Sequence, residues 1–189
     1  MSLVPPALTA TITVGLMSGG MLGTAVPQLA SGVGIGLTLW AQQQTVSTID
    51  TGTLGVGVGL GPFVIPPPLL TANLLVAYAA NGMLGVMAPL EAVGFGNGIA
   101  LGLAQGMLQT MHPLVGTGTG IGRINGPPAF SSIMQGFASV GITGQSSAQK
   151  ANAISMALMM TIQSLVFPVV IVGSASPVAS GGVGNGKIM

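Results

Sequence analysis

The chain has 189 residues, enough for one domain with its own core. Charged residues make up 3% of it, against about 25% in an ordinary soluble domain; they are Asp50, Glu91, Arg123, Lys150 and Lys187. A net charge of +1 argues against nucleic-acid capture by a basic patch, and without cysteine there are no disulfides, thiolate ligands or cysteine nucleophiles.

The first residues, MSLVPPALTATITVGLMSGG, have no Lys or Arg ahead of their apolar run. We therefore expect no secretory signal at this end. Hydrophobic residues make up 49% of the chain and recur in blocks of helix length. A disordered chain is polar and highly charged, so this composition predicts an ordered protein that buries its surface.

Three similar segments follow one another along the chain. PPALTATITVGLMSGGMLG begins at Pro5, PPLLTANLLVAYAANGMLG begins at Pro67, and a looser copy, PPAFSSIMQGFASVGITG, begins at Pro127. This self-similarity predicts three tandem units in one continuous domain, at residues 1–65, 66–126 and 127–189.

Each unit is expected to hold two helices and a ribbon. The first helix has about 17 residues. The second is predicted within 35–50, 97–113 and 152–168, where the second and third of these segments overlay. Each unit then closes with alternating glycine (GVGVGLGPF, GTGTGIGRI, GVGNGKI), which favours an extended ribbon because each glycine costs a helix about 1 kcal/mol. The predicted fold class is mainly α with short glycine-rich extended or β segments, as three tandem helix-helix-ribbon repeats of about 60 residues.

The second helices carry signals of their N-termini. Pro27 and Pro89 suit a first helical position, and Glu91 in a first turn would interact favourably with the helix dipole. In the third unit, Ser146 to Gln149 fits a capping box.

A stripe of small residues is expected to mediate helix packing. Gly98, Gly102 and Gly106 lie four apart and so share one helical face, and Ala153 and Ala157 match two of them in the third unit. Such a stripe lets the backbone of another helix approach closely. The alternative is chance in a chain with 32 glycines.

No set of residues predicts catalysis, and the chain is not expected to be an enzyme or to bind a cofactor or metal. GVGVGLGPF runs into proline rather than a helix, and GNGKIM lacks the Ser/Thr of a phosphate-binding loop. His112 is expected at the end of a helix in a structural role. An enzyme would require Asp50, Glu91 and His112 to converge.

Arg123 and Lys187 occupy the same position of two units, at the ends of their ribbons. They are predicted to contact a neighbouring subunit or a phosphate. The alternative is that each is a solvated tip.

Two environments suit so apolar a surface. Lipid is the alternative we favour less: ISMALMMTIQSLVFPVVIVG, from Ile154, is uncharged over a bilayer's length, and six hydrophobic helices would form a pore or a phage component inserted into the host membrane. Against it, no loop gathers Lys or Arg, aromatic residues are 4%, and glycine ribbons cannot face lipid with unpaired backbone. We favour the second environment, a large symmetric protein particle, because it accounts for both the helices and the ribbons. Permanent interfaces between subunits are apolar, and extended ribbons can pair across subunits.

The endings VGTGTGIGRI and VGSASPVASGGVGNGKI, with the apolar small-residue helices and few charges, resemble small glycine-rich virion structural proteins of tailed bacteriophages. The resemblance implies a capsid, neck, tail or baseplate component located in the virion. Its partners would be copies of itself and other virion subunits. The resemblance carries no functional residues over to this chain.

Overall fold

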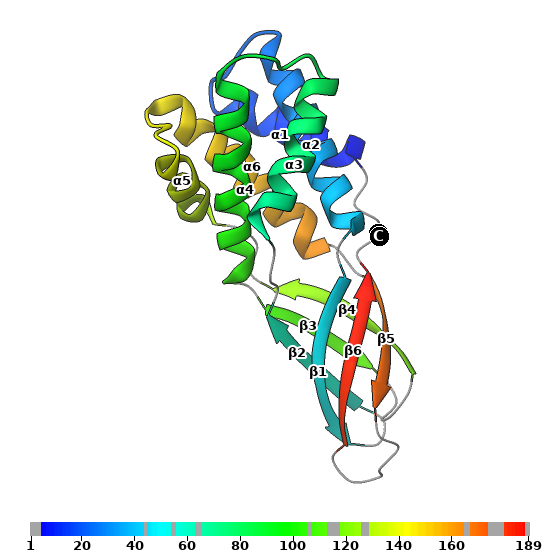
Figure 1. The fold of residues 1–189 in the computed structure, drawn as a ribbon. Helices are drawn as coiled ribbons and strands as arrows, with labels where there is room; N and C mark the ends of the chain where they lie inside the picture. Colours follow the sequence, from blue (N-terminus) through cyan, green and yellow to red (C-terminus); the bar gives the residue numbers. More distant parts are fainter. Residues whose placement is uncertain are drawn as a thin grey trace.

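Pairs of helices alternate with pairs of strands along the chain (Figure 1). The computed structural model describes residues 5–43, 45–53, 56–62, 66–105, 107–112, 118–125, 129–164, 167–173 and 180–187. Within these ranges six helices pack at one end of the molecule and six strands form a closed barrel at the other. The helices are α1 Pro5–Ser18, α2 Ala25–Gln43, α3 Pro67–Ala80, α4 Met87–Ala104, α5 Phe130–Ser139 and α6 Gln145–Ser164. The strands are β1 Thr45–Thr53, β2 Val56–Pro62, β3 Met107–His112, β4 Gly118–Asn125, β5 Phe167–Gly173 and β6 Ser180–Lys187.

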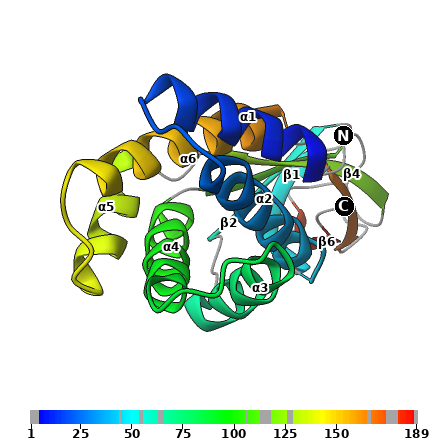
Figure 2. The same ribbon diagram turned by 90° about the horizontal axis from the view of Figure 1, so that it is seen from above.

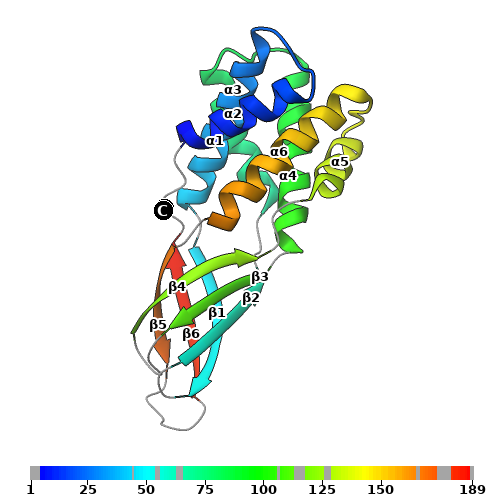
Figure 3. The same ribbon diagram turned by 180° about the vertical axis from the view of Figure 1, so that it is seen from behind.

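The helices form a closed ring, called the helical ring below. Each packs mainly against the next in chain order, and α6 returns to α1 (Figure 2). Seen from behind, α1 and α6 lie side by side above the barrel (Figure 3). Mainly α architecture is therefore confirmed, and the helices place the hydrophobic core inside one ring.

The spacing of apolar residues explains how α1 and α3 enter the ring. Leu8, Ile12 and Leu16 lie four apart on one face of α1, and all three are fully buried. Residues 70, 74 and 78 repeat this pattern on α3. Between α4 and α5, the rings of Phe95 and Phe137 meet edge to face with centroids 4.5 Å apart.

Glycine ends the first helix of each pair in the same way. Gly20, Gly82 and Gly141 have φ of 85°, 75° and 77°, in the left-handed region that side chains disfavour. The following residue donates its backbone N–H to a carbonyl five residues back, as in the bond from Met83 to Tyr78 (2.9 Å). This is the Schellman pattern, and it turns the chain sharply into α2, α4 and α6.

The barrel is an antiparallel meander in which β6 closes the sheet by pairing with β1. The first residue of β1, Thr45, lies opposite Lys187, the last residue of β6. Gly57, Gly59 and Gly61 alternate along β2 and so share one face of the sheet. The predicted glycine ribbons overlap β2, β4 and β6, and each is the second strand of a hairpin.

The C-terminal ends predicted for the second helices are wrong. Helices α2, α4 and α6 end at Gln43, Ala104 and Ser164, and the residues that follow form β1, β3 and β5. These segments pair with glycine-rich strands on both sides, so tertiary pairing decides their conformation rather than their apolar composition. The segment from Ile154 proposed to span a bilayer is likewise part helix and part strand. The first helices have 14, 14 and 10 residues and are shorter than predicted.

Two predicted helix starts also need correction. Pro27 and Pro89 were expected at the first helical position, but they are the third residues of α2 and α4. Glu91 was expected in the first turn of its helix, but it lies beyond that turn of α4 and is buried. Helix α6 begins at Gln145, so Ser146 lies inside the helix and does not start a capping box. The Gln149 side chain instead donates to the backbone carbonyl of Gly19.

Candidate interaction surface and the polar site inside the helical ring

Charge is almost absent from the outside of the helical ring. Of the five charged residues of the chain, Glu91 and Lys150 belong to helices, α4 and α6. The Lys150 ammonium donates to Glu91 Oε2 at 2.8 Å, and the two side chains are 20% and 8% exposed. Helices α4 and α6 are not neighbours in the ring, so this ion pair joins them across its interior.

Large apolar side chains take the place of charge on this surface. Leu22 in the α1–α2 turn and Leu84 in the α3–α4 turn are both 80% exposed, and Val86 beside Leu84 is 88% exposed. These turns lie at the end of the ring farthest from the barrel (Figure 1). On α6, three methionines are also exposed: Met156, Met159 and Met160. Such a surface suits contact with another apolar surface better than contact with water.

Uncharged side chains hold the three seams where one helix pair meets the next. At the α2–α3 seam, Asn73 Nδ2 donates to Gln43 Oε1 at 3.1 Å, and the Gln43 amide donates back. At the α4–α5 seam, Asn97 Nδ2 donates to Ser139 Oγ at 3.3 Å. Gln149 makes the third link, between α6 and the α1–α2 turn. Each seam is thus joined by an amide, without a surface charge.

The predicted small-residue positions lie in the ring, apart from Gly106, which follows α4 and is outside the described residues. A Cβ on Gly98 would lie 2.6 Å from Ile133 Cα of α5, so the two backbones approach closely there. Gly102 is buried on α4, and Ala153 and Ala157 are buried on α6.

The sequence analysis aligned residues 97–113 with residues 152–168. The structure shows that this alignment of α4 with α6 is wrong by one helical turn, because the turn glycines Gly82 and Gly141 correspond. Gly82 and Gly141 have the same backbone conformation. Counted from these glycines, Gly98 corresponds to Ala157, and Ala153 corresponds to Gly94. The error arose because small residues recur every four residues, so the pattern looks the same when one helix is shifted by one turn.

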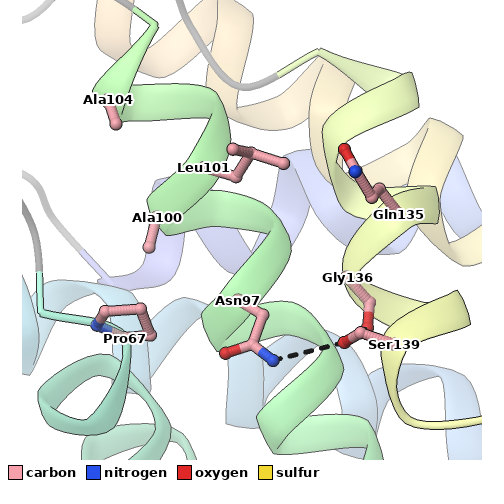
Figure 4. A pocket seen from close by; sticks show the side chains of 8 residues that line it. All are labelled: Pro67, Asn97, Ala100, Leu101, Ala104, Gln135, Gly136 and Ser139. Atoms are coloured by element: carbon pink, nitrogen blue, oxygen red, sulfur yellow. Dashed lines mark hydrogen bonds between the residues drawn. The ribbon is translucent and has the colours of Figure 1, made fainter.

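A pocket of about 400 Å³ opens at the α4–α5 seam (Figure 4). The hydrogen bond from Asn97 to Ser139 spans it, and Gln135 lies on its α5 side. Its lining contains no titratable side chain: Pro67, Asn97, Ala100, Leu101, Ala104, Gln135, Gly136 and Ser139. Ser139 supplies a hydroxyl, but none of these lining side chains is a base that could activate it as a nucleophile.

The barrel register places the remaining charged residues. Arg123 lies opposite Gln109 and Lys187 opposite Thr45, near the starts of β3 and β1. Those strands follow α4 and α2, so both basic residues lie at the barrel end that meets the helical ring, not at its far end. Their contact with another subunit stays a prediction.

The structure does not bring together the three residues that an enzyme would need. His112 is the last residue of β3 and lies opposite Gly57, so its predicted place at a helix end is wrong. Asp50 lies within β1, whereas Glu91 is buried in the helical ring.

Tyr78 is a further polar residue of the ring interior that the sequence analysis missed. It is 1% exposed, and its ring lies against α2, where a Cβ on Gly32 would come within 2.6 Å of Tyr78 Cδ1. Burial raises the pKa of the Tyr78 hydroxyl well above its usual 10.0, and the charge of Glu91 raises it further. Alignment from the turn glycines could have found the site, because Glu91 and Lys150 then occupy the same position in two units.

Comparison with known proteins identifies no relative: no family model, curated protein or solved structure matches this chain.

Proposed function

We propose that the protein is a non-enzymatic structural subunit of a large symmetric assembly, a component of a bacteriophage virion. Its partners are copies of itself and other virion subunits. The uncharged outer surface of the helical ring carries this proposal. Glu91 and Lys150, the charged residues of the helices, bind each other, while Leu22, Leu84 and Val86 are at least 80% exposed.

The composition of that surface matches permanent interfaces between subunits. Interfaces lose charged residues at their centres and gain methionine and aromatic side chains relative to other surface. The exposed methionines of α6 and the apolar turns supply such contacts. Left in water, the same side chains would drive association, because each buried apolar side chain contributes about 1.5–3 kcal/mol.

The internal organisation supports a position on a symmetry axis. Each proposed unit contributes a helix pair and a strand hairpin, and three such sets close one ring and one barrel. The turn glycines Gly20, Gly82 and Gly141 have the same conformation in the three sets. A chain with three similar faces fits a threefold or sixfold environment, since closed symmetry is the usual form of oligomers.

The second candidate is an integral membrane protein. One helix of the described residues, Met87–Ala104, is long and apolar enough to cross a bilayer, although 61% of it is buried inside the protein. A spanning helix needs about 20 residues, whereas α1, α3 and α5 have 14, 14 and 10. These lengths favour the protein assembly over six spanning helices.

The test is to purify the chain without detergent and measure its mass by light scattering over a range of concentrations. We expect a discrete oligomer, or co-sedimentation with virion particles when it is made in infected cells. A compact monomer at high concentration in plain buffer would contradict the proposal. Flotation with phosphatidylcholine vesicles, without sedimentation in particles, would favour the membrane candidate instead.

A further inference from the structure

The helical ring buries an ion pair and a tyrosine hydroxyl in a mainly apolar core. Tyr78 on α3, Glu91 on α4 and Lys150 on α6 place three polar groups there. Counted from the turn glycines, the corresponding positions of the other units carry apolar residues: Leu16, Phe137 and Leu29. This combination of polar residues therefore occurs once in the ring and is not repeated in each unit.

The α3–α4 turn connects the two helices that carry Tyr78 and Glu91. Tyr78 lies near the end of α3 and Glu91 in the second turn of α4, on either side of that tight turn. Helices α3 and α4 pack against each other, and both side chains are buried, so each places a polar group inside the helical ring. The charge of Glu91 also raises the pKa of the Tyr78 hydroxyl. Lys150 approaches from α6 and donates to Glu91 Oε2, which leaves Oε1 of the same carboxylate for another donor.

Two buried oxygen atoms of this site lack a hydrogen-bond partner among the described residues: Tyr78 Oη and Glu91 Oε1. The residues are 1% and 6% exposed, so bulk water does not reach them freely. Leaving a buried polar atom unsatisfied costs about 1–3 kcal/mol, and more for a charged group. Native proteins satisfy such atoms with protein groups or with internal water.

We propose that the site binds one internal water molecule, which accepts from the Tyr78 O–H and donates to Glu91 Oε1. The chemistry selects water over an ion. Glu91 and Lys150 already neutralise each other, so a cation or an anion would add an uncompensated charge. The free groups are one donor and one acceptor, and water matches both at once.

Lys150 offers a third bond to the same water, as buried waters usually make about three hydrogen bonds. Its ammonium has three N–H donors, and the bond to Glu91 Oε2 uses one. The bound water would thus link α3, α4 and α6 across the interior of the ring. This site is independent of the proposed structural function.

The test is an experimental structure of the full chain at a resolution that shows ordered water, for the wild type and for Tyr78→Phe. Phenylalanine already occupies the equivalent position 137, so the variant is expected to fold. In the wild type we expect one solvent peak at about 2.7–3.2 Å from both Tyr78 Oη and Glu91 Oε1. In Tyr78→Phe that peak should be lost or move toward Lys150.

Two results would overturn the proposal. The first is a direct hydrogen bond from Tyr78 Oη to Glu91 Oε1 with no solvent peak between them. The second is an interior without solvent density in which both oxygens stay unpartnered. A peak that persists unchanged in Tyr78→Phe would show water bound to other groups and would also count against it.

Discussion

The backbones of α4 and α5 approach closely at Gly136 of α5, and replacing this glycine with alanine tests the packing of the ring. A Cβ there would lie 2.6 Å from Gly98 Cα and closer still to Gly98 N and the carbonyl oxygen of Gly94. These are backbone atoms of α4, so no side chain can rotate away. Carbon atoms in favourable contact are about 3.5–4.0 Å apart, so α4 and α5 must separate by about 1 Å.

The expected cost follows from that displacement. Overpacking of a close-packed interior costs about 1–3 kcal/mol, and a rigid backbone neighbour favours the upper end. Alanine recovers about 1 kcal/mol because it is a better helix former than glycine. We therefore expect Gly136→Ala to lower the free energy of unfolding by about 2 kcal/mol, which exceeds the effect of most surface substitutions.

The assay is urea unfolding of the purified protein, followed by circular dichroism at one fixed protein concentration because any association would shift the midpoint. Gly85→Ala is the matched control: a Cβ there would meet nothing within 4 Å, and Gly85 does not have positive φ. The control should be neutral or gain up to about 1 kcal/mol from reduced freedom of the unfolded chain. If the two variants were equally stable, the close approach of α4 and α5 would be refuted.

Three further predictions follow from the ring interior and its surface. Lys150→Leu leaves the Glu91 carboxylate buried without its partner and should cost about 3 kcal/mol in urea unfolding, whereas the double variant Glu91→Leu/Lys150→Leu should recover most of that loss. The pKa of Tyr78 is raised in the folded state, so just above pH 10 only the unfolded chain loses the Tyr78 proton. The free energy of unfolding should therefore fall by about 1.4 kcal/mol per pH unit in that range. In Tyr78→Phe the urea unfolding midpoint should fall less steeply above pH 10 than in the wild type. An equally steep fall in both proteins would show that other groups cause it. Met160→Glu adds a charge to an exposed apolar position and should dissociate the proposed oligomer, which light scattering would detect as a lower mass. The control Gln42→Glu, at an exposed polar position, should leave the mass unchanged.

The sequence predicted the helical class because the relevant signals are local. The four-residue spacing of Leu8, Ile12 and Leu16 specifies a buried helical face without reference to the rest of the chain. The turn glycines Gly20 and Gly82 end helices for a reason that is equally local, since only glycine readily adopts their positive φ.

The strands that follow α2, α4 and α6 could not be found in this way. Segments such as 107–112 and 167–173 are apolar and continue from helices, so their own pattern does not separate helix from strand. Their partners lie in other parts of the chain, and the barrel closes only when β6 meets β1. Long-range pairing therefore determines these elements.

The ion pair of the candidate site was missed for a related reason. Glu91 and Lys150 are 59 residues apart, and Glu91 was interpreted only through the start of its own helix. The turn glycines give a better frame, because they place both residues at one position of two successive units. In a chain with five charges, two opposite charges at equivalent positions are a usable signal of contact.

The position of the charges connects the ring's stability to its proposed role. Opposite charges inside the ring attract across a poorly solvated space, where their interaction is stronger than at a wet surface. Placing Glu91 and Lys150 there leaves the outer faces of the helices free of ions that a docking subunit would have to desolvate. The amide links at the three seams have the same effect, since they hold the helix pairs together without surface charge. The ring can therefore be stable in itself while its surface stays suited to burial against other subunits.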